Sequence, residues 1–137
     1  MLHAEPDFKL MKMLGYDAMT LGDLEFTGPR EILMQQREWA GFPFLSANVI
    51  KKQTGELLVD RYIIKEFDGL QVAIFGLTLE EISVLGDHGY IGDLEFRSVI
   101  ETAQDLVPKL RAEADLVIGL PHIGCHETAG VGYRNPG

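Results

Sequence analysis

The sequence predicts one α/β domain in which a mixed β-sheet is flanked by helices. Amphipathic stretches alternate with short apolar runs, and two β-rich segments are joined by a two-residue turn. At 137 residues and 46% hydrophobic, the chain is long enough for one core and too short for two ordinary domains. We expect the domain to occupy residues 1–128, and the glycine-rich residues 129–137 to form an irregular tail.

The first half of the chain predicts two helices and two strands. Pro6 suits a first helical turn, and Gly15 is placed to end that helix in a left-handed cap. Pro29 opens the second helix, and Gly41 stops it. The predicted elements, in order, are a helix over Pro6–Leu14, a strand over Asp17–Leu21, a helix over Pro29–Ala40 and a strand over Phe44–Val49.

The second half predicts a hairpin, a long helix and a last strand. Asp68-Gly69 is a strong signal for a two-residue hairpin turn. Pro108 lacks an amide hydrogen and should kink or split the long helix. The last strand delivers His122 at its carboxyl end, where ligands gather in sheets of this kind. These elements are the hairpin Arg61–Phe67 with Leu70–Leu77, the helix Arg97–Ala114 and the strand Asp115–Leu120.

Composition excludes some partners. The formal charge of −9 and the pI near 4.8 give no basic surface for nucleic acid or an anionic membrane. No apolar run approaches the ~20 residues that span a bilayer, and charges interrupt Met1–Leu14, so we expect no membrane span and no signal peptide. The single cysteine, Cys125, excludes an internal disulfide framework and leaves the compartment open.

Four ordered segments resemble the 5′-nucleotidase family of calcineurin-like metallophosphoesterases. They are LGYDAMTLGDLEFTG at Leu14–Gly28, FPFLSANV at Phe42–Val49, GLQVAIFGLT at Gly69–Thr78 and ADLVIGLPHIG at Ala114–Gly124. The resemblance implies a partial metallophosphoesterase-like (α/β/β/α) domain, the central part of a catalytic domain. It also implies that the intact form hydrolyses phosphate or sulfur esters with two divalent ions, Mn or Zn, and it suits a periplasmic or extracellular protein.

The resemblance assigns two metal-ligand positions and no catalytic residue. The family's G-N-H-E-F-D segment corresponds to Gly22–Thr27, which places Asp23 at the position of the ligand Asn. Leu24 and Thr27 replace the catalytic His and Asp, although Thr27 is similar to the G-H-W-E-F-T of the thiosulfate-processing branch. His122 in LPHIG matches a histidine ligand of the same ion. Substrate-binding residues stay unassigned.

The other polar residues are interpreted structurally. Glu25 is expected to fix its loop as a hydrogen-bond acceptor, and Asn48 to form a turn at the end of a strand. Surface positions are expected for His3 and His88, and a solvated loop for Asp87, Asp93 and Glu95. A metal cluster of His122 with Cys125, His126 and Glu127 is a weaker alternative, since the resemblance gives those three residues no role.

Three functions follow from this pattern. The first is an enzyme fragment, because the resemblance places a D-x-H motif upstream of Leu14 and an H-x-H motif beyond Gly137. A structural metal site needs about four ligands, and only two ligand positions are present, so the chain alone can lack a metal. By itself it should not hydrolyse an ester efficiently. The second is an inactive scaffold or interaction protein. The third, a small-molecule binding module, has no positive feature.

We also expect association. In the intact family the sheet is completed by further strands, so this segment should expose unpaired strand edges and an uncovered apolar face. The expected partner is a second copy of the chain, or another chain that completes the sheet. A homo-oligomer with two-fold symmetry is the commonest form of such pairing.

Overall fold

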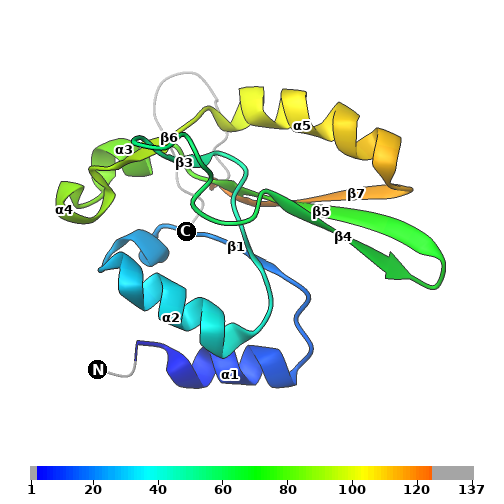
Figure 1. Cartoon of the computed structure of the whole chain (residues 1–137), viewed down its shortest axis with the longest axis horizontal. Helices are drawn as coiled ribbons and strands as arrows, with labels where there is room; N and C mark the ends of the chain where they lie inside the picture. Colours follow the sequence, from blue (N-terminus) through cyan, green and yellow to red (C-terminus); the bar gives the residue numbers. More distant parts are fainter. Residues whose placement is uncertain (1–2, 125–137) are drawn as a thin grey trace.

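The computed structural model describes residues 3–124 (Figure 1). Helices alternate with short strands along the chain, which confirms the predicted α/β class. The elements are α1 (Glu5–Met13), β1 (Met19–Thr20), the 3₁₀ turn η1 (Leu24–Phe26), α2 (Arg30–Ala40), β2 (Phe44–Leu45), β3 (Val49–Lys51), β4 (Tyr62–Phe67), β5 (Leu70–Thr78), α3 (Ile82–Leu85), α4 (His88–Ile91), β6 (Leu94–Phe96), α5 (Val99–Glu113) and β7 (Leu116–His122).

The largest sheet is mixed and has the strand order β4-β5-β7. The antiparallel pair β4 and β5 turns at Asp68 and Gly69, whose φ angles of 48° and 87° are those of a primed hairpin turn. This confirms the predicted hairpin. β7 runs parallel to β5 in a register that pairs Thr78 with His122. Two short ladders complete the architecture, with β1 parallel to β2 and β3 antiparallel to β6.

Helices lie on both sides of this sheet (Figure 1). α5 covers one face, where Leu106 and Leu110 pack with Ala73 and Phe75 of β5. α1 and α2 lie on the other side, beyond the β1–β2 ladder (Figure 1). β1 and β2 approach β5 closely at Gly76, where an added Cβ would lie 2.5 Å from the Leu45 carbonyl oxygen. The ends of β1 and β5 therefore meet beside each other.

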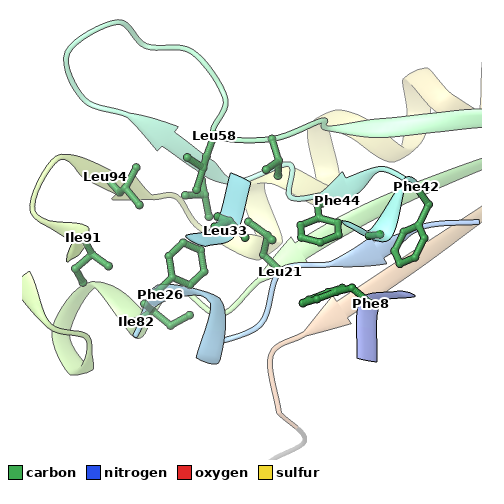
Figure 2. Close-up of a cluster of buried hydrophobic side chains, with 13 residues drawn as sticks. Phe8, Leu21, Phe26, Leu33, Phe42, Phe44, Leu58, Ile82, Ile91 and Leu94 are labelled. Atoms are coloured by element: carbon green, nitrogen blue, oxygen red, sulfur yellow. The ribbon is translucent and has the colours of Figure 1, made fainter. Parts of the chain in front are cut away.

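Aromatic side chains fill the core between α1, α2 and η1 (Figure 2). Phe44 is fully buried, and its ring centroid lies 5.5 Å from that of Phe8 and 6.0 Å from that of Phe42. Phe26 of η1 is buried and meets Phe96 edge to face at 5.1 Å. Because η1 is anchored by Phe26, the loop that begins at Gly22 has a fixed position.

Two strand predictions and one helix prediction need correction. The run Phe44–Val49 is two strands, β2 and β3, because the chain between them turns inward to make side-chain hydrogen bonds. The strand predicted over Asp17–Leu21 is reduced to β1. A kink or a split was predicted at Pro108, and the helix is not split, because α5 runs unbroken through that residue. Packing of buried Leu106 and Leu110 against the sheet, on either side of Pro108, favours one continuous helix.

The acidic stretch from Asp87 to Glu95 is not the predicted solvated loop. Asp87 caps α4 by accepting a hydrogen bond from the amide of Gly89 at 2.8 Å. Asp93 accepts two hydrogen bonds from Arg30, and Glu95 lies in β6 beside Arg97. His3 and His88 are exposed, as expected. Within residues 3–124, no helix combines the length and the hydrophobicity that crossing a membrane requires.

Candidate functional site

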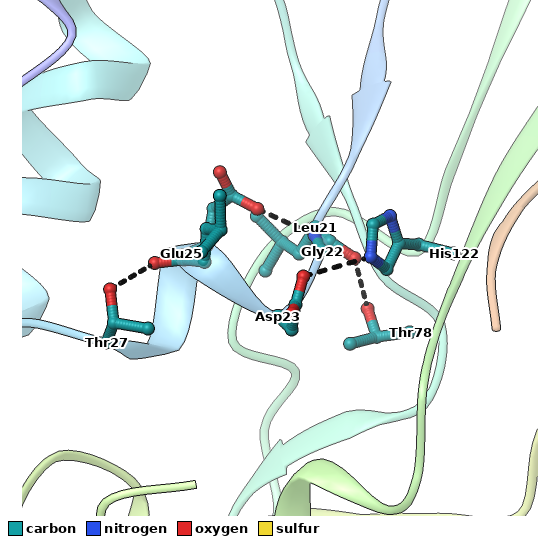
Figure 3. Close-up of polar contacts among 8 residues, drawn as sticks. Leu21, Gly22, Asp23, Glu25, Thr27, Thr78 and His122 are labelled. Carbon is teal, nitrogen blue, oxygen red and sulfur yellow. Dashed lines mark hydrogen bonds and ion pairs between the residues drawn. The ribbon is translucent and has the colours of Figure 1, made fainter. Parts of the chain in front are cut away.

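Asp23 and His122, which are 99 residues apart in the chain, meet in space (Figure 3). Asp23 directly precedes η1, and His122 is the last residue of β7. The distance from His122 Nε2 to Asp23 Oδ1 is 3.1 Å. The two side chains are therefore close enough to share one ion, although Asp23 precedes η1 and is not at the end of a strand. Their role as metal ligands stays a prediction.

The loop that carries Asp23 is held by its own side chains (Figure 3). The amide of Gly22 donates to Glu25 Oε2 at 2.7 Å, so Glu25 is the loop-fixing acceptor that the sequence predicted. Thr27 Oγ1 donates to the Leu24 carbonyl at 2.7 Å, which closes the 3₁₀ turn. Leu24 is 73% exposed, so the position that the resemblance assigns to a catalytic histidine holds an apolar group in solvent.

A buried polar network lies beneath this loop. Thr78 Oγ1 donates to the Leu21 carbonyl at 3.0 Å and lies 2.8 Å from Ser46 Oγ. Asn48 accepts from the Thr78 amide at 2.9 Å and donates to the carbonyls of Thr78 at 2.7 Å and Arg97 at 2.9 Å. This role of Asn48 was not predicted from the sequence. The available signal was that Ser46 and Asn48 are polar residues within an otherwise apolar run.

Arg30 and Asp93 form an ion pair. Arg30 at the start of α2 donates two hydrogen bonds to Asp93, at 2.7 and 2.6 Å. The hydrogen bonds from Arg30 lower the pKa of Asp93 below its ordinary value, and the same bonds raise the pKa of Arg30. This bidentate pair connects α2 to the segment between α4 and β6.

A cavity of about 250 Å³ opens beside Asp23. Apolar side chains from η1, α3 and the end of β5 form most of its wall, with two carboxylates among the lining residues. The lining consists of Asp23, Phe26, Thr27, Leu79, Ile82, Gly86 and Asp87. The site therefore adjoins a small, largely apolar recess.

The donor chemistry of the pair fits part of a metal site. A carboxylate oxygen and an imidazole nitrogen suit Mn²⁺ or Zn²⁺. The side chains of Asp23 and His122 are 60% and 50% exposed, so both can be reached from solvent. No group of three or more His, Cys, Asp or Glu side chains placed to hold an ion occurs within residues 3–124. The described residues thus provide two donors of an incomplete set, and Cys125, His126 and Glu127 lie outside the described residues.

Comparisons with known proteins show that this segment is similar to part of several nucleotidases. No family model matches the chain. It is 43% identical over 136 residues to a 5′-nucleotidase of Vibrio vulnificus, covering 98% of this chain and 25% of that protein. The chain therefore spans about a quarter of the length of the curated relatives it matches.

Two solved structures share the fold. The calcineurin-like phosphoesterase YfkN of Bacillus subtilis matches 93% of this chain and 41% of its own, with a TM-score of 0.79 and 31% identity. The sulfate thiohydrolase SoxB of Thermus thermophilus matches 88% of this chain and 22% of its own, with a TM-score of 0.77 and 26% identity. The similarity thus extends to a nucleotidase, a phosphoesterase and a sulfate thiohydrolase.

Proposed function

The chain belongs to the 5′-nucleotidase family of calcineurin-like metallophosphoesterases, and on that premise we propose that it is the central part of a metal-dependent ester hydrolase. In this proposal, Asp23 and His122 are two ligands of one divalent ion. The observation that carries it is the 3.1 Å contact between the side chain of Asp23, which precedes η1, and that of His122 at the end of β7. The intact protein would act on a phosphate or sulfur ester.

The ligand pair defines what this chain contributes. A bound divalent ion in such a site activates water and neutralises charge on the ester. Asp23 offers a hard carboxylate oxygen, and His122 offers an imidazole nitrogen. The remaining ligands would come from the larger part of the protein, since the chain spans about a quarter of its relatives. By itself the chain should bind an ion weakly and hydrolyse no ester efficiently.

The residues at the positions of the family's catalytic dyad favour a divergent chemistry. Leu24 and Thr27 can neither transfer a proton at neutral pH nor stabilise charge as a His–Asp pair does. The loss of such a group costs about 10²–10⁴-fold in the rate of ordinary phosphate-ester hydrolysis. Similarity to a sulfate thiohydrolase supports a sulfur ester as the alternative substrate class.

Metal titration tests the ligand assignment. Isothermal calorimetry with MnCl₂ and with ZnCl₂ should show weak binding of one ion to the chain and its loss in His122→Ala. His88→Ala is the matched control, because His88 is exposed and lies in α4, and it should leave the binding unchanged. Equal binding by both variants would remove His122 from the site. Metal retained at one ion per chain through purification would show a more complete site than we propose.

A phosphatase assay tests the incompleteness of the site. The double variant Leu24→His with Thr27→Asp should show no appreciable hydrolysis of a generic aryl phosphate, with or without Mn²⁺. A restored dyad acts only on a phosphoryl group that two ions already hold. A large metal-dependent gain in the double variant would contradict the proposal.

The exposed side of β7 favours a second function, association with another chain. Within residues 3–124, β7 pairs only with β5, and its Leu116 and Ile118 side chains are exposed on the face away from α5. Free strand edges and exposed apolar side chains favour pairing. We propose a homo-oligomer, or a second chain that completes the sheet, as the partner.

Light scattering after gel filtration, at micromolar protein and moderate salt, tests this association. The chain should elute above the monomer mass, and Ile118→Lys should shift it toward the monomer. Ile100→Lys is the control, because Ile100 is an exposed apolar residue that lies on α5 and not on β7. A monomer mass for the unaltered chain would exclude this function.

A further inference from the structure

We infer that Gly22 is a positioning residue for the imidazole of His122. A Cβ atom added to Gly22 would lie 2.9 Å from Cε1, 3.0 Å from Nδ1 and 3.1 Å from Nε2 of His122. Contacts under 3.0 Å do not persist between such atoms, so the ring occupies space that only glycine leaves open. The flat side of the ring thus rests on the Gly22 backbone, and its Nε2 atom reaches Asp23 (Figure 3).

The backbone under the ring is fixed from both sides. The Leu21 carbonyl accepts a hydrogen bond from the buried Thr78 hydroxyl at 3.0 Å. The Gly22 amide donates to Glu25 Oε2 at 2.7 Å. Because these bonds hold residues 21 and 22 against the end of β5, the backbone cannot retreat when a side chain is added. The half-exposed His122 ring must move instead.

Space, rather than backbone conformation, requires the glycine at this position. Gly22 is not among the glycines with a positive φ angle, which include Gly15 and Gly41. Alanine can therefore adopt the Gly22 conformation without left-handed strain. The atom that gives way is part of a side chain at the end of a strand, so the substitution should disturb the ring and leave the fold intact.

Displacement of the ring would separate the pair. The contact between His122 Nε2 and Asp23 Oδ1 is 3.1 Å, and a shift of about 1 Å takes such a pair out of hydrogen-bond range. The position of the ring on Gly22 is a property of the metal-free protein, so it does not depend on whether an ion binds. If an ion binds, the same shift would pull its two donors apart.

The comparison of Gly22→Ala with Gly28→Ala tests the inference. Gly28 lies just beyond the same loop, also has no positive φ angle, and the nearest atom to an added Cβ is Ile32 Cδ1 at 4.0 Å. Carbon–proton correlation spectra, recorded at the same pH for every variant, report the ring environment directly. The His122 signals are assigned by their loss in His122→Ala.

The expected result is a shift of the His122 ring signals in Gly22→Ala and no comparable shift in Gly28→Ala, with a cooperative melt in both variants. Unchanged His122 signals in Gly22→Ala, or equal shifts in the two variants, would overturn the inference. If Gly22→Ala does not fold, Glu25→Ala decides, because it releases the Gly22 amide and adds no atom near the ring. It should shift the same signals by a smaller amount, and an unshifted spectrum would equally overturn the inference.

A metal titration provides an independent readout. In the unaltered chain, Mn²⁺ should broaden the signals of His122 and Asp23 together, since paramagnetic broadening falls steeply with distance from the ion. In Gly22→Ala, higher Mn²⁺ concentrations should be needed for the same broadening at His122. Failure of Mn²⁺ to bind either protein would count against the proposed function and leave the ring-shift test of Gly22 unaffected.

Discussion

The polar residues beneath the Asp23 loop and those on top of it differ in how completely they are bonded. Ser46, Asn48 and Thr78 are fully buried, and their hydrogen bonds connect the segment between β2 and β3 with the end of β5 and with the residues that follow β1 and β6. Asp23 and His122 are about half exposed and share one contact. The buried network has its bonding capacity used within the fold, whereas the exposed pair retains capacity for a ligand. The hydrogen bonds of the scaffold are therefore satisfied within the described residues, whereas those of the site are not.

The two groups also differ in what their bonds contribute to stability. A buried group that loses its partner costs about 1–3 kcal/mol, because water does not replace the lost bond. An exposed ion pair contributes about 0–1 kcal/mol, because water replaces its partner at little cost. Substitutions of graded burial can test whether this division holds in the molecule.

The largest effect is expected for Asn48→Ala. It removes four hydrogen bonds and leaves the Ser46 hydroxyl, the Thr78 amide and the carbonyls of Thr78 and Arg97 without that partner. We expect a loss of about 3 kcal/mol in the free energy of unfolding, measured by urea denaturation.

The matched control is Gln36→Ala, which removes an exposed amide that donates to the His3 carbonyl at 3.0 Å. It should cost less than about 0.5 kcal/mol, as substitutions at exposed positions usually do. Equal costs for the two variants would erase the distinction between the buried network and the surface.

An intermediate effect is expected for Asp93→Asn. The Arg30–Asp93 pair is bidentate, but the Asp93 side chain is 43% exposed, so solvent screening reduces its contribution to about 0.5–1 kcal/mol. Because folding lowers the pKa of Asp93, its contribution is fully present above the ordinary Asp value of about 3.9 and is lost as pH falls below it.

Unfolding curves at about pH 7 and about pH 3 measure this dependence. The difference in stability between the unaltered chain and Asp93→Asn should shrink at the lower pH. Asp105→Asn is the control for a solvated helix pair, since Asp105 accepts from Lys109 one turn along α5. A difference for Asp93→Asn that stays constant with pH would show that the ion pair is not its origin.

The sequence predicted the parts of the molecule that local chemistry determines. The Asp68-Gly69 turn was predictable because both residues tolerate positive φ. The role of Glu25 as a hydrogen-bond acceptor was predictable because its donor, the Gly22 amide, is only three residues away. The proximity of Asp23 and His122 followed from motifs of a known family that assign both residues to one ion.

The parts that were mispredicted depend on contacts between distant segments. Asn48 reads as a turn former locally, and its partners Thr78 and Arg97 lie 30 and 49 residues away. Asp93 reads as a solvated acid, and its partner Arg30 is 63 residues away. The local chemistry of Pro108 disfavours a continuous helix, but α5 continues through it because the helix packs against the sheet on both sides of this residue.

The smallest effect on stability is expected for His122→Ala. The variant removes a half-exposed ring with one contact to Asp23, so the free energy of unfolding should change by less than about 0.5 kcal/mol. After removal of the ring, water can hydrogen-bond to the Asp23 carboxylate, because its side chain is 60% exposed. Urea denaturation of His122→Ala beside His88→Ala measures the change against another exposed histidine. A cost above about 1 kcal/mol for His122→Ala would place it with the buried network, as part of the scaffold rather than of a site kept available for a ligand.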